Sequence, residues 1–98
     1  MLTVIETPTF QKQADKVWTT AELHTFIDWI SKNPTAGDVI RDADGARKVR
    51  WGVQGRGKRG GVRVIFFNLS ADGVVLLLAI YAKAERENLT PLEIKRTA

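Results

Sequence analysis

Residues 51–67, WGVQGRGKRGGVRVIFF, place glycines and cations directly before an apolar run in the interior of the chain. The first thirteen of these positions hold five glycines and four cations. Glycine lets the backbone approach a ligand closely, and lysine and arginine bind the oxygens of a phosphate chain. Flexible basic segments usually lie at chain ends, where disorder costs the fold little. An adjoining core strand would hold one end of this segment in place, as a site for chemistry requires.

The positive charge of the protein is concentrated in and just before this stretch. The 98 residues have a net charge of +4, from fifteen cations and eleven acids. Residues 47–63 contain seven cations and no acid, so eight cations and eleven acids remain, a balance of −3. Such a polarised field favours a polyanion such as nucleic acid, or an acidic protein partner; a solvated basic hairpin is the alternative. The seven cations are Arg47, Lys48, Arg50, Arg56, Lys58, Arg59 and Arg63.

Two lysines and an arginine have the chemistry to move a proton and to hold a phosphate. Lys58 lies close to Arg56 and Arg59, and like charges disfavour its ammonium form and lower its pKa, which makes it a candidate general base. Lys83 is the second candidate, because burial near a strand end would lower its pKa as well. Arg63 stands at the entrance of a predicted strand, where a fixed guanidinium could brace a phosphate in a forked contact. Arg56 and Arg59 would steer the phosphate backbone and stabilise developing charge.

The elements before this segment are a short strand and two helices. The β-branched residues of LTVIE (2–6) favour a strand. Thr7 followed by Pro8 predicts a helix start, and Thr19 with Glu22 predicts a capping box at the start of a second helix. The second helix has apolar residues at helical spacing and ends at Asn33-Pro34. Residues 35–45, TAGDVIRDADG, have turn chemistry and are expected to form a connecting loop, in which Asp42 and Asp44 shape the backbone or pair with arginines.

Three strands and a last helix are expected in the remainder of the chain. The strands are ARKVRWGV (46–53), GVRVIFFNL (61–69) and VVLLLAIYA (74–82), and SADG joins the last two as a tight hairpin. Residues 84–98 are expected to form a helix that is broken or restarts near Pro91. The order β-α-α-β-β-β-α predicts an α+β domain spanning residues 1–98, with helices packed on a small antiparallel sheet.

The hairpin register decides whether Arg63 and Tyr81 can act together. A three-residue loop, 71–73, with a left-handed Gly73 would place Ser70 opposite Val74 and Arg63 opposite Tyr81. Gly61 would then lie opposite Lys83. A two-residue loop would pair Arg63 with Ala82 and turn Arg63 and Tyr81 to opposite faces. Both strands are apolar on both faces, so the sequence leaves the two registers open.

Four stretches of the chain resemble RelE-superfamily toxins of bacterial type II toxin–antitoxin systems. The resemblance is closest to the HigB/RelE-like branch. The resemblance lies in NPTAGDVI, GARKVRW, GRGKRGGVRVIFF and LLLAIYAKAERENLT, which occur in the family's order between residues 33 and 90. It implies a metal-independent endoribonuclease that cuts messenger RNA in the A site of the 70S ribosome and so inhibits translation. It also implies a cognate antitoxin, often with a helix-turn-helix domain, so that operator DNA is contacted only through the antitoxin.

Cleavage of RNA through its 2′-hydroxyl requires a base, a phosphate clamp and an acid for the 5′ oxygen. The expected catalytic residues are Lys58, Arg63, Tyr81 and Lys83, and the expected RNA-binding residues are Arg47, Lys48, Arg50, Arg56 and Arg59. Tyr81, the only tyrosine, could assist proton transfer, stack on a base or cap the core. The only histidine, His24, lies far from the cations and is expected to be structural. Some relatives carry a catalytic tyrosine in the C-terminal helix, where ENLTPLEIKRTA has none.

The remaining expectations concern aromatic residues, cofactors and compartment. Trp18 and Trp29 are expected in the core, and Trp51 as an anchor or a stacking surface for the basic loop. We expect no metal site and no cofactor, because the basic stretch lacks clustered carboxylates. The absence of cysteine, of a signal peptide and of a long apolar run predicts a cytoplasmic protein without membrane contact. Two alternatives to a nuclease are a non-catalytic RNA- or ribosome-binding module and a module that only binds an antitoxin.

Overall fold

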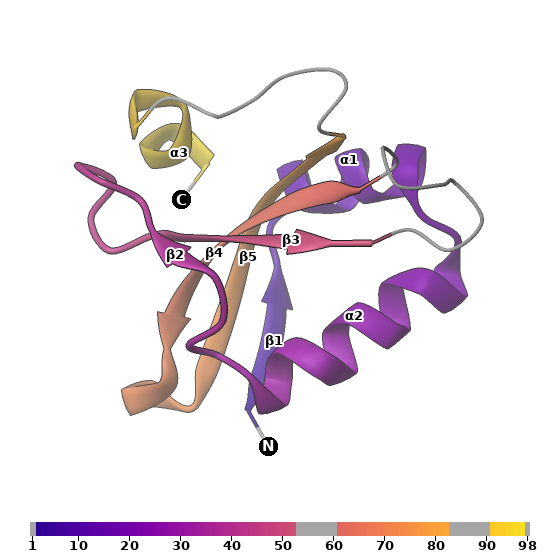
Figure 1. The fold of residues 1–98 in the computed structure, drawn as a ribbon, viewed down its shortest axis with the longest axis horizontal. Coiled ribbons are helices and arrows are strands. Elements are labelled where there is room, and N and C mark those ends of the chain that lie inside the picture. The colour runs from indigo at the N-terminus through magenta and orange to yellow at the C-terminus, as the bar shows by residue number, and fades with distance from the viewer. Residues whose placement is uncertain (1, 53–60, 83–90, 98) are drawn as a thin grey trace.

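The computed structural model describes residues 2–52, 61–82 and 91–97 (Figure 1). The first strand is followed by two helices, then by four further strands, and a third helix comes last. In chain order they are β1 (Thr3–Glu6), α1 (Pro8–Val17), α2 (Thr20–Lys32), β2 (Asp38–Val39), β3 (Arg47–Trp51), β4 (Val62–Leu69), a 3₁₀ turn (Ser70–Asp72), β5 (Val74–Ala82) and α3 (Pro91–Thr97).

Both N-terminal helices begin with the caps that the sequence predicts. The Thr7 hydroxyl oxygen accepts the Phe10 N–H at 3.2 Å, and Pro8 occupies the first helical position of α1. Thr19 and Glu22 form a reciprocal capping box at the start of α2, with hydrogen bonds of 2.8 and 3.2 Å. Asn33 ends α2 as predicted. These caps satisfy N–H groups that a helix leaves unpaired at its start.

The five strands form one sheet in the order β1-β5-β4-β3-β2, which confirms the α+β class. The sheet is mixed, because β1 pairs with β5 in parallel while the other neighbours are antiparallel. The sheet was expected to be antiparallel throughout, and the parallel pairing of β1 with β5 corrects this expectation. The segment 35–45, expected as a loop, contains the two-residue strand β2. Two residues are too few to produce the alternation by which a strand is recognised in sequence.

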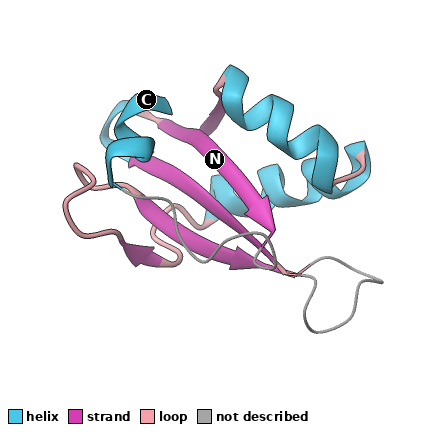
Figure 2. Ribbon diagram, turned by 90° about the horizontal axis from the view of Figure 1, so that it is seen from above, coloured by secondary structure: helices cyan, strands magenta, loops and turns pink. Residues whose placement is uncertain are grey.

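The two faces of the sheet are covered by different helices. On one face, α1 and α2 contribute Phe10, Phe26 and Ile30 to a core with Val64 and Leu77. On the other face, Ile94 of α3 packs against a smaller buried cluster that includes Ile65, Leu78, Ala79 and Tyr81. In Figure 2, α1 and α2 lie together beside the sheet and α3 lies apart from them. The face under α3 is called here the α3 face.

Candidate nucleic-acid interface

A β-bulge in β5 sets the position of the candidate site. The hairpin pairs Leu69 with Val74, so the expected Ser70–Val74 pair is wrong and the connection is one residue longer. Gly73 is left-handed, as expected, with φ 76°. Farther along, Phe66 pairs with Leu77 but Ile65 pairs with Ala79, which leaves Leu78 as an extra residue in β5.

Side chains from the N-terminal part of the chain brace this bulge. The Thr7 hydroxyl donates to the carbonyls of Leu77 at 2.9 Å and Leu78 at 3.2 Å. The side-chain oxygen of Gln13, on α1, accepts the Ile80 N–H at 2.9 Å. A bulge disrupts the regular ladder, and these contacts satisfy backbone groups of β5 at and just beyond the bulge. The bulge is therefore a supported feature of the fold.

The bulge turns the end of β5 over, so that Tyr81 lies on the same face as Arg63. Val75 and Leu77 belong to the core under α1 and α2, whereas Leu78, Ala79 and Tyr81 belong to the cluster on the α3 face. The extra residue advances the register by one, and a one-residue shift exchanges the faces of all following side chains. As a result Arg63 pairs directly with Tyr81, which is the pairing that the catalytic hypothesis requires, one of the two that the sequence left open.

Arg50 completes a row of three polar side chains across β3, β4 and β5. Arg50 pairs with Arg63 on one side, and Arg63 pairs with Tyr81 on the other. Directly opposed residues of neighbouring strands have their Cβ atoms about 5 Å apart, and like charges in such a pair destabilise the sheet. Neither arginine has an acidic partner among the described residues. Within the described ranges, no acidic side chain neutralises this row, and a bound anion could do so.

Arg63 is the most constrained cation of the row. The residue is only 5% exposed, and its Nε–H finds no acceptor among the described residues. A buried N–H without an acceptor is costly, because it loses water without gaining a hydrogen bond. Arginine also offers a planar fork that matches a phosphate or carboxylate. Arg63 lies on the α3 face, and at 5% exposure it would meet an anion there only after neighbouring groups move.

Tyr81 is packed rather than open. It is 6% exposed and contacts the cluster around Ile94 of α3. A ring buried to this extent cannot stack on a nucleobase unless the groups that cover it first move away. Of the three roles expected for Tyr81, core capping is therefore present in this structure, and stacking is the one that its packing disfavours.

The structure separates the predicted RNA-binding residues of β3. Lys48, which pairs with Ile65, and the exposed Arg50 lie on the α3 face. Arg47 lies on the opposite face, where its guanidinium donates to the carbonyls of Thr35, Ala36 and Gly37 at 2.7–3.1 Å. Arg47 therefore holds a loop, and three of its five N–H donors are already occupied.

Four of the predicted site residues, Arg56, Lys58, Arg59 and Lys83, lie outside the described residues, as does the expected Gly61–Lys83 pair. The described strands nevertheless show where these segments join the sheet. Residues 53–60 connect the end of β3 to the start of β4, and residues 83–90 follow the end of β5. These strand ends are neighbours, because Trp51 pairs with Val62 and Val62 pairs with Ala82.

Other residues singled out from the sequence have structural positions. Trp18 is buried, as expected, and Trp29 is half-buried against the same core. Trp51 contacts Trp29 and Phe26 at ring distances of 4.9 and 5.2 Å, which makes it a hydrophobic anchor beside residues 53–60. His24, which was expected to be structural, is an exposed residue of α2.

The loop before β3 is shaped by its acids, as expected. Asp42 and Asp44 adopt left-handed backbone, with φ of 60° and 55°. Between and after them, Ala43 and Ala46 are buried on the α3 face. Aspartate tolerates this conformation better than most residues.

Sequence reasoning missed Thr7 and Gln13 as supports of the site, and Arg47 as the clamp of a loop. A threonine that caps a helix and a glutamine on a helix surface carry no signal of a distant bulge. In the described ranges, no three histidine, aspartate or glutamate side chains gather as ligands for a metal ion. No helix within those ranges has the length and apolar character needed to cross a bilayer.

The comparison with known proteins identifies the fold. The sequence matches no protein-family model. Among solved structures, the chain is similar to the E. coli toxin RelE, determined as a double arginine-to-alanine mutant in the free state. The TM-score is 0.62 at 15% sequence identity, and the match covers 88% of this chain and 87% of that one. The chain therefore has a RelE-like fold.

Proposed function

We propose that this protein is the toxin of a type II toxin–antitoxin system and cleaves messenger RNA on the ribosome without a metal ion. The observation that carries the proposal is Arg63, a buried arginine with an unpaired Nε–H in a row with Arg50 and Tyr81. The basic segment 53–60 joins the sheet at this row. The RelE-like fold supports the same reading.

The proposed reaction is an in-line attack of the 2′-hydroxyl on the adjacent phosphate. A base takes the 2′ proton while the bond from the 2′ oxygen to phosphorus forms. The bond to the 5′ oxygen then breaks, an acid protonates that oxygen, and a 2′,3′-cyclic phosphate remains. Arg63 would hold the non-bridging oxygens, where negative charge develops. Lys58 and Lys83, outside the described residues, are proposed as base and acid in either order, with Tyr81 as an alternative proton donor.

The substrate-binding surface proposed here consists of Lys48, Arg50, Arg56 and Arg59. Arg47 is left out, because its guanidinium is engaged with three carbonyls. The proposed partners are the messenger in the ribosomal A site, the 70S ribosome and a cognate antitoxin, through which operator DNA is contacted indirectly. The cytoplasm is the proposed compartment.

A non-catalytic module that binds RNA, the ribosome or an antitoxin is the second candidate function. The packing of Tyr81 favours it, because the only tyrosine of the chain is 6% exposed within the buried cluster of the α3 face. On this reading the arginine row is a docking surface for anions. Affinity for RNA would then be retained, and the RNA would stay intact.

A translation reaction with primer extension on the messenger distinguishes the two functions. The wild-type protein should give ribosome-dependent cuts at defined positions, and Arg63→Met should reduce the cleavage rate by about a hundredfold or more. Arg41→Met is the matched control, because Arg41 is an exposed arginine away from the row. Intact messenger with the folded wild-type protein would refute cleavage, and salt-sensitive RNA binding without cuts would favour the second candidate.

A further inference from the structure

The outer edge of β1 presents backbone groups that the sheet does not use. The Thr3 N–H donates to Gly73 at 2.9 Å and the Thr7 N–H donates to Leu77 at 3.1 Å, so the odd residues face β5. Successive residues of a strand direct their backbone groups to opposite edges. Val4 and Glu6 therefore direct theirs outward, where no described residue pairs with them.

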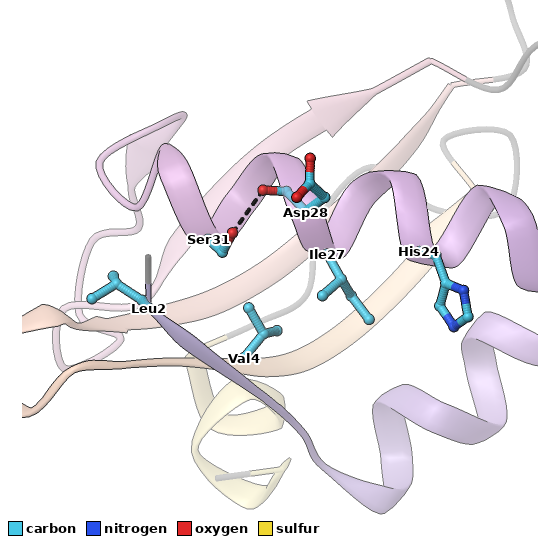
Figure 3. A pocket seen from close by; sticks show the side chains of 6 residues that line it. All are labelled: Leu2, Val4, His24, Ile27, Asp28 and Ser31. Carbon is cyan, nitrogen blue, oxygen red and sulfur yellow. Dashed lines mark hydrogen bonds between the residues drawn. The ribbon is translucent and has the colours of Figure 1, made fainter.

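An open groove of about 250 Å³ lies between this edge and α2 (Figure 3). Its apolar lining comes from Leu2 and Val4 of the first strand and from Ile27 of the helix. The groove narrows where the Leu2 N–H donates to the Ser31 carbonyl at 3.3 Å, which ties the start of β1 to the end of α2. His24 and Asp28 complete its rim.

The opposite face of β1 is also apolar and uncovered. Ile5, which alternates with the groove-facing residues, is 45% exposed and is one of four large hydrophobic residues exposed in the described ranges. A strand placed beside β1 would put alternate side chains into the groove and against Ile5. One added strand would thus cover both apolar surfaces and pair with the outward backbone groups.

We propose that this edge binds an extended peptide segment of a protein partner by strand addition. The segment should be apolar at successive positions, because both faces of β1 offer apolar contacts. Its flanks should be basic, since Glu6 ends β1 and Asp28, which pairs with Lys32 at 3.2 Å, lies on the rim of the groove. The other sheet edge is a poorer site, because β2 has only two residues and one of them is Asp38. This proposal does not depend on the nuclease function.

A synthetic probe tests the proposal: an acetylated peptide with a valine- and isoleucine-rich centre and flanking lysines, titrated into the labelled protein. Binding should be saturable and should protect the amides of Val4 and Glu6 from hydrogen exchange. The amides of Thr3 and Ile5 are directed at β5 and should change little. A peptide N-methylated at alternate residues keeps its apolar surface but loses hydrogen bonds, and should bind about tenfold more weakly or worse, about 1.4 kcal/mol.

Two variants of the protein make the test specific. Val4→Pro removes one outward N–H without touching the bonds to β5, and proline is tolerated at sheet edges. Ile27→Lys places a charge in the groove if Val4→Pro does not fold. Each should weaken peptide binding about tenfold or more. Val39→Lys, at the β2 edge, is the matched control and should bind like the wild type.

Several outcomes would overturn the proposal. Absence of saturable binding, equal binding of the N-methylated peptide, or protection that maps to the arginine row would each do so. Tighter binding of a peptide with glutamate flanks would contradict the charge argument. A dimer of the free protein that Val4→Pro dissociates would show that a second copy of the chain occupies this edge instead.

Discussion

Arg47 and Arg63 belong to the same basic stretch and the same pair of strands, yet the structure gives them opposite situations. Arg47 makes three hydrogen bonds to carbonyls on one face of the sheet. Arg63 is buried on the other face with an unpaired Nε–H. A guanidinium with its partners in place stabilises the fold, whereas one without them carries a desolvation cost. Substitutions at the two positions should therefore change stability in opposite directions.

Arg63→Met should leave the free energy of unfolding unchanged or raise it by about 1–2 kcal/mol, because a buried arginine with an unsatisfied Nε–H is replaced by an apolar chain of similar length. Urea unfolding followed by tryptophan fluorescence measures this change, with Arg41→Met as the exposed control. A loss of more than about 2 kcal/mol would mean that Arg63 stabilises the fold through bonds within the protein.

Arg47→Met should lower the free energy of unfolding by about 1–3 kcal/mol, because three carbonyls of residues 35–37 lose a charged donor. The same urea experiment applies, with Arg50→Met as the control from the exposed face of the same strand. Affinity for single-stranded RNA should fall less than it does for Arg50→Met. If Arg47→Met weakens RNA binding as much, Arg47 belongs to the interface after all.

At the scale of elements, the β5 bulge decides which face Tyr81 occupies, and α1 supports it through Gln13. Gln13→Met removes the acceptor of the Ile80 N–H and should cost about 1–2 kcal/mol. Hydrogen exchange of the Ile80 amide should accelerate by about tenfold or more relative to the amides in the middle of β4. Gln11→Met, at an exposed position of the same helix, is the control. Unchanged exchange at Ile80 would show that the bulge holds without this contact.

At the scale of the whole molecule, the charge asymmetry predicts strongly salt-dependent binding of single-stranded RNA. Each phosphate contact contributes about −0.7 to the slope of log K against log salt concentration. Four contacts would give a slope of about −2.8 and about a fiftyfold loss of affinity between about 50 and 200 mM salt. Arg50→Ala should reduce the slope by about 0.7, and Arg41→Ala should leave it unchanged. Filter binding over a salt series measures both, and a wild-type slope near zero would rule out a phosphate-binding surface.

Much of the local structure could be predicted from the sequence, because its causes lie within a few residues of one another. The caps at Thr7 and at Thr19 with Glu22, the helix end at Asn33 and the left-handed Gly73 are all of this kind. The concentration of cations in residues 47–63 is equally a property of the sequence alone. Together with the predicted order of the elements, these features led to the α+β class that the structure confirms, and the cations directed attention to the end of the sheet where Arg50 and Arg63 lie.

The arrangement of the site depends on contacts between residues far apart in the chain, so only the tertiary structure decided it. The connection at residues 70–73 is longer than either loop that the sequence left open, and the pairing of Arg63 with Tyr81 results from the bulge at Leu78. That bulge is held by Thr7 and Gln13, about 70 residues earlier in the chain. Both strands are apolar on both faces, so no alternation in the sequence could reveal the shift. The sequence determined which charges the protein carries, and long-range hydrogen bonds decided which of them share a face.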